Sequence, residues 1–274
     1  MTSPFVAQWL VASSLLNISA QENAIKPYLN LDGPNGVYFK PRGVCRTNAN
    51  GVELTYVRIY KTGNSMICGL MKKFQHGPRR HALTFTFVRD PLKHFVSGFT
   101  EIIHRAPTRP SYTQQQYQFM RNLADPLATA KAFIRDFVGQ QLNQNSDVTD
   151  AHSFPQVAFL RNHLPSKLHF IGTLQEERGF EKSFRTLSSL INYTIIPGKN
   201  EHHPKTSSTS GNKYRLAMNS LLLSFNEFKE AMCRTLLIDY ICLNFTLPND
   251  CAKAIGLPNI VCPPQMSARV LRSQ

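Results

Sequence analysis

Acidic side chains are scarce in this chain of 274 residues, which has 17 aspartates and glutamates against 31 lysines and arginines. The formal net charge of +14 predicts an anionic partner, such as nucleic acid, a phosphorylated cofactor, an acidic glycan or a membrane surface. We do not expect nucleic acid, because the sequence has no RNA- or DNA-binding motif and no block of like charge.

The sequence also lacks a Cys-x-x-Cys pair, which disfavours a zinc site or a thioredoxin-like redox site. Four of its six cysteines follow residue 232, and this clustering predicts disulfides in an oxidising compartment. Cys251–Cys262 and Cys233–Cys242 are the simplest local pairs, but four cysteines allow three pairings. We expect Cys68 to be a small, buried hydrophobic residue of a helix.

Long hydrophobic runs are missing as well. The apolar segment at residues 5–18 is too short and too polar to predict a membrane span. We interpret residues 1–20 as a signal peptide or a short anchor that associates the protein with a membrane, although no basic residue precedes Lys26. Sequons at Asn17, Asn192 and Asn244 allow glycosylation in the secretory pathway.

A Walker A loop, with its Gly-Lys-Ser/Thr at the end, is absent, but another anion-binding pattern is present. Residues 54–60 form a β-branched and aromatic run that predicts a strand, and residues 66–74 have the apolar spacing of a helix. Between them lies a polar turn that begins with Lys61. Unpaired N–H groups at the start of a helix favour an anion there.

A second strand–turn–helix pattern follows. Residues 83–88 predict a strand, and residues 92–104 predict a helix with Asp90 as its N-cap and a proline at its first position. Arg89 and Ser97 lie two helical turns apart, so they could hold a second anionic group. Both turns would lie at the carboxyl ends of strands, where open α/β sheets bind ligands.

Together the two segments resemble those of the sulfotransferases, specifically the Golgi carbohydrate sulfotransferases. In that family a Tyr-Lys-Thr-Gly-like loop holds the 5′-phosphosulfate of the donor 3′-phosphoadenosine 5′-phosphosulfate (PAPS). An Arg-Asp-Pro…Val-Ser-Gly-Phe segment holds its 3′-phosphate. Residues 87–91 and 95–99 match the second segment closely, whereas Tyr60 replaces the more usual proline of the first. The resemblance implies that PAPS is bound, without a metal ion, by Lys61, Thr62, Gly63, Asn64, Ser65, Arg89 and Ser97.

The acceptor hydroxyl must lose a proton, and a histidine is a suitable general base. The segment 150–156 resembles an Asp-x-His-x-x-Pro-Gln segment of many carbohydrate sulfotransferases, which makes His152 the first candidate. His104, at the end of the helix after the Arg-Asp-Pro motif, is the second. Glu101 is a third, although it is more simply interpreted as a solvated helix residue.

We expect an α/β fold of the P-loop-like, three-layer type, with a central parallel sheet flanked by helices and a helical C-terminal part. Residues 21–53 are interpreted as an extended arm, 54–246 as the sulfotransferase domain, and 247–274 as an irregular, cysteine-containing tail. A further helix is expected at 127–137 and a strand at 168–172. An apolar stripe at 180–191 predicts a helix that faces the core.

The predicted function is transfer of a sulfuryl group from PAPS to a hydroxyl of an acidic acceptor, most simply a carbohydrate, in the Golgi lumen or membrane. Lys61 would be catalytic, with His152 or His104 as the base. Two alternatives stay open at this point. One is a secreted glycan-binding protein of the same fold without activity, and the other is a nucleotide kinase of the P-loop type.

Overall fold

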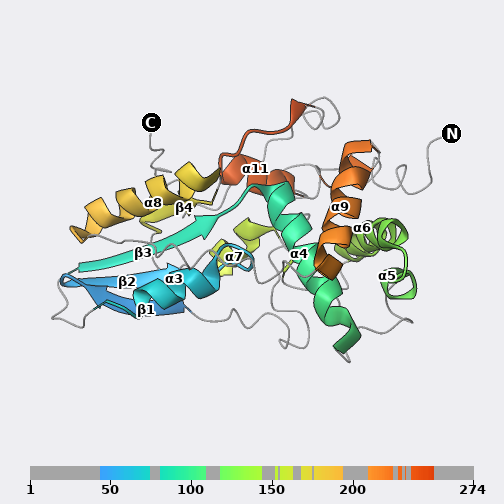
Figure 1. Cartoon of the computed structure of the whole chain (residues 1–274). Helices are drawn as coiled ribbons and strands as arrows, with labels where there is room; N and C mark the ends of the chain where they lie inside the picture. Colours follow the sequence, from blue (N-terminus) through green and yellow to red (C-terminus); the bar gives the residue numbers. More distant parts are fainter. Residues whose placement is uncertain are drawn as a thin grey trace.

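One sheet organises the part of the chain that the structure describes, and its strands follow one another in sequence order (Figure 1). In this computed structural model the strands are β1 (Val44–Ala49), β2 (Val52–Val57), β3 (His81–Val88) and β4 (Phe170–Thr173). The described residues are 44–74, 81–108, 118–143, 152–153, 155–162, 168–174, 176–193, 209–224, 228–229, 232 and 236–249.

Strands β1 and β2 form an antiparallel hairpin, in which Ala49 pairs with Val52. The two turn residues both have positive φ, 50° at Asn50 and 79° at Gly51. An Asn-Gly pair is the usual choice for such a two-residue turn, because both residues tolerate this conformation. The expectation of an extended arm is therefore wrong for residues 44–53, which belong to the sheet.

The expected parallel sheet is confirmed for β2, β3 and β4 but not for β1. β2 pairs with β3, and β3 with β4, in parallel. Helix α3 (Asn64–Met71) connects β2 to β3, and α4 (Pro91–Arg105) follows β3 directly. The carboxylate of Asp90 accepts a hydrogen bond from the backbone N–H of Lys93 at 2.9 Å, which confirms Asp90 as the N-cap of α4.

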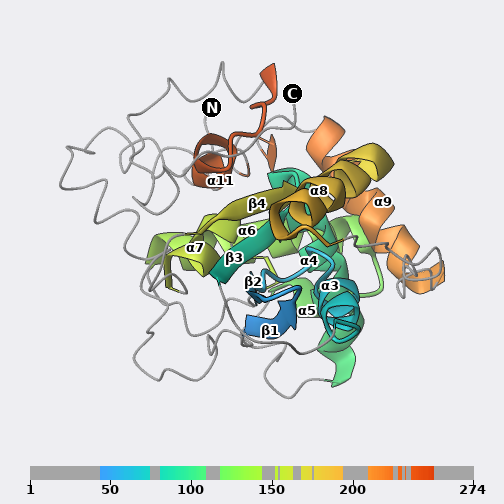
Figure 2. The ribbon, with the colours of Figure 1, turned by 90° about the vertical axis from the view of Figure 1, so that its left-hand side faces the viewer.

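Alternate residues of the strands contribute to two separate hydrophobic clusters, one on each face of the sheet. Tyr56 and Phe87 pack with α3 and α8 (Glu176–Ile191), whereas their neighbours Val57 and Val88 pack with α4 and the helices beyond it. Figures 1 and 2 show α4 running away from the end of β3, and further helices complete this cluster. They are η1 (Ala106–Thr108), α5 (Gln118–Arg121), α6 (Pro126–Asn143), α7 (Gln156–Asn162), α9 (Thr209–Ser224) and α11 (Leu237–Cys242).

Two helices expected from apolar spacing are confirmed. The stripe at 180–191 lies on α8, and its residues Phe180, Phe184, Leu187 and Ile191 are all buried. The helix expected at 127–137 is α6, which begins at Pro126 and extends to Asn143.

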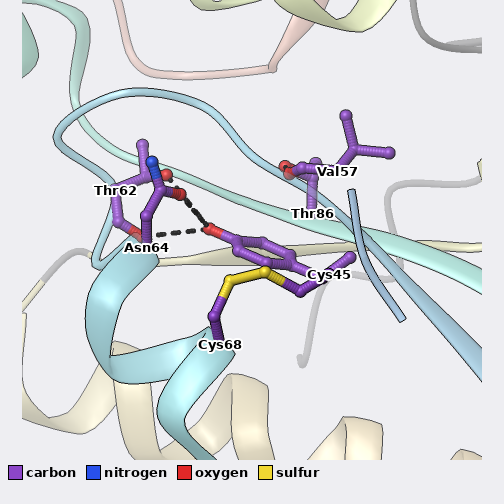
Figure 3. The surroundings of a disulfide bond; sticks show 7 residues. Cys45, Val57, Thr62, Asn64, Cys68 and Thr86 are labelled. Carbon is purple, nitrogen blue, oxygen red and sulfur yellow. Dashed lines mark hydrogen bonds between the residues drawn. A yellow bond between two sulfur atoms is a disulfide. The ribbon is translucent and has the colours of Figure 1, made fainter. Parts of the chain in front are cut away.

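A disulfide joins Cys45 of β1 to Cys68 of α3 (Figure 3). The expectation that Cys68 is a simple buried hydrophobic residue is therefore wrong. The bond attaches the helix that follows the Lys61 turn to the edge of the sheet. Cys242 is also disulfide-bonded. The expected pairs Cys251–Cys262 and Cys233–Cys242 each include residues outside the described part of the chain.

Asn192 and Asn244, the asparagines of two sequons, end α8 and α11 in left-handed conformation, with φ of 49° and 58°. Each helix closes with the hydrogen bonds of a Schellman motif, such as Tyr193 N–H to the Ser188 carbonyl at 3.0 Å. Both side chains are exposed. Helix capping alone explains an asparagine at these positions, so the sequons carry no separate evidence of glycosylation.

The expected signal peptide or anchor at 1–20, most of the arm, the sequon at Asn17 and the tail after residue 249 lie outside the described residues. Among the helices that the structure describes, none combines the length and apolar character needed to cross a membrane.

Candidate functional site

The two turns singled out in the sequence lie side by side. Tyr56 near the end of β2 is in register with Phe85 of β3, and the strands run in the same direction. Residues 58–63 and residues 89–90 therefore leave the sheet at the same end, where the carboxyl ends of β2 and β3 lie. This end is where parallel α/β sheets place their ligands.

The first turn presents backbone N–H groups. Lys61 and Gly63 both have positive φ, 62° and 75°, on either side of Thr62. Gly63 is the N-cap of α3 and offers no side chain to satisfy the first N–H groups of that helix. Such a turn before a helix forms a concave site for an anion. Ser65, in the first turn of α3, is exposed beside it.

The polar side chains of this turn do not all face outward. Thr62 is fully buried, and its hydroxyl donates to the Ile59 carbonyl at 2.7 Å. Tyr56 is also fully buried, and its hydroxyl donates to Oδ1 of Asn64 at 2.8 Å, a bond that Figure 3 draws as a dashed line at Asn64. Thr62 can therefore contribute its backbone N–H to a ligand, but its hydroxyl is committed to the loop itself.

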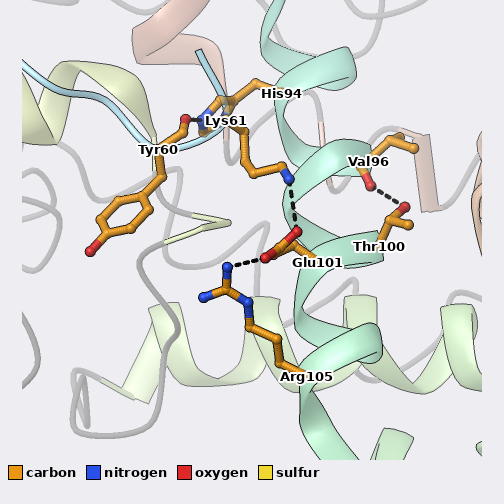
Figure 4. Close-up of polar contacts among 7 residues, drawn as sticks. All are labelled: Tyr60, Lys61, His94, Val96, Thr100, Glu101 and Arg105. Carbon is orange, nitrogen blue, oxygen red and sulfur yellow. Dashed lines mark hydrogen bonds and ion pairs between the residues drawn. The ribbon is translucent and has the colours of Figure 1, made fainter. Parts of the chain in front are cut away.

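Lys61 reaches across to helix α4 (Figure 4). Its Nζ lies 3.0 Å from Oε2 of Glu101, which also forms an ion pair with Arg105 one turn further along. Burial alone raises the pKa of Glu101, but Lys61, Arg105 and His152 outweigh it, so the pKa lies below its ordinary value. The interpretation of Glu101 as a solvated residue is wrong, since its side chain is 12% exposed and doubly paired.

His94 lies in the first helical turn of α4 and connects the loop after β3 to the loop that contains Lys61. Its Nε2 lies 2.7 Å from the Tyr60 carbonyl, which can only accept, so Nε2 carries the proton. Burial lowers the pKa of His94 to about 4, against this hydrogen bond, and electrostatic interactions with Arg89, His152 and Lys61 lower it further. These three candidates therefore act electrostatically on one buried, neutral imidazole. No motif in the sequence marks His94 as a residue of the site.

Arg89 is partly buried at the end of β3. Burial lowers the pKa of its guanidinium, Asp90 acts in the opposite direction, and the nearby Arg215 of α9 lowers the pKa further. Within the described residues the guanidinium forms no ion pair at contact distance. A desolvated charge without a partner is costly, so this site favours an anionic ligand. Ser97 lies two turns into α4 and is partly exposed.

His152 lies against the first turn. Its ring is 4.5 Å from that of Tyr60 between centroids, and the residue is 6% exposed. Its backbone packs on α4 at Gly98, where a Cβ atom would approach the His152 carbonyl oxygen to 2.0 Å. Only a glycine allows this approach. The structure thus places His152 against Tyr60, the residue before Lys61, and both His152 and Lys61 have contacts with α4.

A buried network supports the segment that carries His152. The side-chain amide of Gln156 accepts from the Arg89 N–H at 2.8 Å and donates to the Arg89 carbonyl at 2.7 Å. The carboxylate of Asp239, from α11, accepts from the N–H groups of Gln156 and Val157 at the start of α7. Burial raises the pKa of Asp239 to about 7, against these hydrogen bonds. Asp239 of α11 therefore caps the N-terminus of α7 and links α11 to the segment that carries His152.

His104 is exposed in the last turn of α4, and no contact among the described residues joins it to Lys61 or His152. The described residues also contain no group of three or more histidines, cysteines or acids placed to hold a metal ion.

Comparison with protein-family models, with curated proteins and with solved structures found no match to this chain. The two turns and the contacts around them are therefore the basis for a functional interpretation.

Proposed function

We propose that the protein transfers a sulfuryl group from PAPS to a hydroxyl of an acceptor, most simply an acidic carbohydrate. The observation that carries the proposal is the pairing of two anion-binding turns at one end of the sheet. One turn contains Lys61 and an uncapped helix start, and the other contains the guanidinium of Arg89, which forms no ion pair with the residues that the structure describes. A donor with an anionic group at each end suits two such turns.

In this proposal the backbone N–H groups of residues 62–65 bind the 5′-phosphosulfate, and Lys61 stabilises the charge that develops on the bridging oxygen. Arg89 and Ser97 bind the 3′-phosphate, which distinguishes PAPS from ATP. The acceptor oxygen forms a bond to sulfur as the bond from sulfur to the phosphate oxygen breaks. His152 takes the acceptor proton, and its position against Tyr60 beside Lys61 favours it over His104.

The fold belongs to the same proposal. We assign the sheet to the P-loop-like, three-layer type, supported by two helix-covered faces and parallel strands β2 to β4. We also place the protein in the secretory pathway, in the Golgi. The Cys45–Cys68 disulfide supports this placement, since such bonds persist in oxidising compartments.

The first test is thermal unfolding with 3′-phosphoadenosine 5′-phosphate (PAP), beside ATP with Mg²⁺ and adenosine 5′-phosphosulfate. A ligand that binds only the folded state raises the melting temperature. We expect stabilisation by PAP alone, and its loss in Arg89→Ala. Arg185→Ala, which removes an exposed arginine of α8, is the matched control and should respond like the wild type.

A folded wild-type sample that PAP does not stabilise would contradict the donor assignment. Stabilisation by a sulfated glycan alone would then support the glycan-binding alternative, and stabilisation by ATP with Mg²⁺ alone would support a kinase. The catalytic role is tested separately: Lys61→Ala should remove most transfer from radiolabelled PAPS while the protein stays folded.

A further inference from the structure

We propose that Tyr56 is a positioning residue that turns the side-chain amide of Asn64 so that its N–H groups face the 5′-phosphosulfate of the donor. This inference rests on the proposed function, because it assumes that the first turn binds that group. Tyr56 itself would never touch the ligand, since it is fully buried beneath the turn.

Counting protons around the Tyr56 hydroxyl fixes the orientation of the amide. The hydroxyl has one proton and three polar neighbours: Oδ1 of Asn64 at 2.8 Å, and the carbonyl and hydroxyl oxygens of Thr62, both at 3.4 Å. The Thr62 hydroxyl already donates to the Ile59 carbonyl, so it has no proton for Tyr56. All three neighbours are therefore acceptors, and Asn64 is much the nearest.

The opposite orientation of the amide leaves these groups poorly paired. With the Asn64 nitrogen facing Tyr56, the hydroxyl would accept from Asn64, and its own proton would have only the 3.4 Å contacts to Thr62. Contacts of that length are weak hydrogen bonds. Burial also raises the pKa of Tyr56, so the hydroxyl keeps its proton. Tyr56 therefore holds the carbonyl oxygen of Asn64 inward.

With its oxygen held inward, Asn64 presents an NH₂ group at the first position of α3. Figure 3 shows this nitrogen on the side of Asn64 away from the dashed hydrogen bonds. The amide then adds donors to the backbone N–H groups that begin the helix. An oxygen in the same place would repel an anion, so the orientation decides whether Asn64 favours or opposes a phosphosulfate.

The test is the dissociation constant of PAP by calorimetry for the wild type, Tyr56→Phe, Asn64→Ala, the double variant, and Asn64→Asp. We expect Tyr56→Phe to weaken binding about fivefold in the wild-type background and to have no further effect in Asn64→Ala. A merely structural role of Tyr56 would weaken binding by the same factor in both backgrounds, and that result would overturn the inference.

Asn64→Asp keeps an acceptor for Tyr56 but directs a negative charge at the ligand, so we expect at least a tenfold loss of affinity without a loss of thermal stability. Asn192→Asp is the matched control, because Asn192 lies beside the Asn50 turn at the opposite end of β2. Unchanged affinity in Asn64→Asp would overturn the inference even if Tyr56→Phe did not fold. A wild type that does not bind PAP would instead overturn the proposed function.

Discussion

The ammonium of Lys61 lies 3.0 Å from the carboxylate of Glu101, although 40 residues separate them in the sequence. The contact joins the loop that contains Lys61 to the third helical turn of α4. A lysine side chain has many rotamers, and this partner selects one of them. Glu101 therefore fixes where the charge of Lys61 lies in the absence of a ligand.

Replacing Glu101 by glutamine should lower the turnover number about tenfold, because the neutral amide holds the ammonium less firmly. The affinity for PAP should not fall, since the change removes a negative charge near an anion-binding turn. Steady-state kinetics with radiolabelled PAPS and calorimetry with PAP measure the two effects. Glu181→Gln, which breaks an exposed ion pair on α8, is the control. Weaker PAP binding with unchanged turnover would contradict this role.

Replacing Gly98 by alanine should displace the His152 segment, because the new methyl group would lie 2.0 Å from the His152 carbonyl oxygen. We expect a loss of about 1–3 kcal/mol of stability, as for other overpacked sites, and a larger effect on transfer than on PAP binding. Gly69→Ala in α3 is the control, since a Cβ there meets nothing within 4 Å. Equal stability of the two variants would show that the approach at Gly98 is not restrictive.

The buried imidazole of His94 should make the protein less stable in acid. Its pKa is about 4 when folded and 6.5 ordinarily, so the unfolded chain binds the proton more readily between these values. Stability from this group is complete above pH 6.5 and is lost as the pH falls toward 4, by up to about 3 kcal/mol.

Urea unfolding of the wild type and His94→Gln between pH 4 and 7.5 measures this effect. Asp239 works in the opposite direction, because its pKa is raised from 3.8 to about 7 and its contribution is lost as the pH rises through that range. The difference between wild type and variant therefore isolates His94. A difference that does not change with pH would contradict the assignment.

Removing the disulfide by Cys45→Ala with Cys68→Ala should lower the free energy of unfolding by about 3 kcal/mol. The estimate follows from the loss of a closed loop with a sequence separation of 23 residues. Denaturant unfolding of wild type and double variant measures it. Reduction of the wild type should lower stability by at least as much, because it also breaks the disulfide of Cys242, and a reduced protein as stable as the oxidised one would contradict the prediction.

Local patterns were sufficient to predict the elements that carry the site. Strand β3, the Asp90 cap and helix α4 follow from a β-branched run, an Asp-Pro pair and apolar spacing, all of which act between near neighbours. The apolar stripe of α8 was equally clear. The β1–β2 hairpin was missed, although its Asn50-Gly51 pair is a recognised turn signal.

The contacts that organise the site could not be predicted in the same way. Tyr56 under Asn64, His94 against Tyr60, and Glu101 beside Lys61 depend on how strands and helices meet in three dimensions. The carboxylate of Asp239 likewise accepts from the N–H of Gln156, 83 residues away, and so caps α7. The hydrophobic periodicity of a sequence cannot predict such pairs, because each pair forms through the tertiary arrangement and not through a local repeat.

The Cys45–Cys68 bond also makes the geometry of the site depend on the compartment in which the chain is oxidised. It attaches α3, whose first residues complete the Lys61 turn, to a strand at the edge of the sheet. A chain made in a reducing compartment would lack this attachment and would present the turn on a less constrained helix. Under the proposed function, the oxidation of two sulfur atoms would therefore favour binding of the donor in an oxidising compartment.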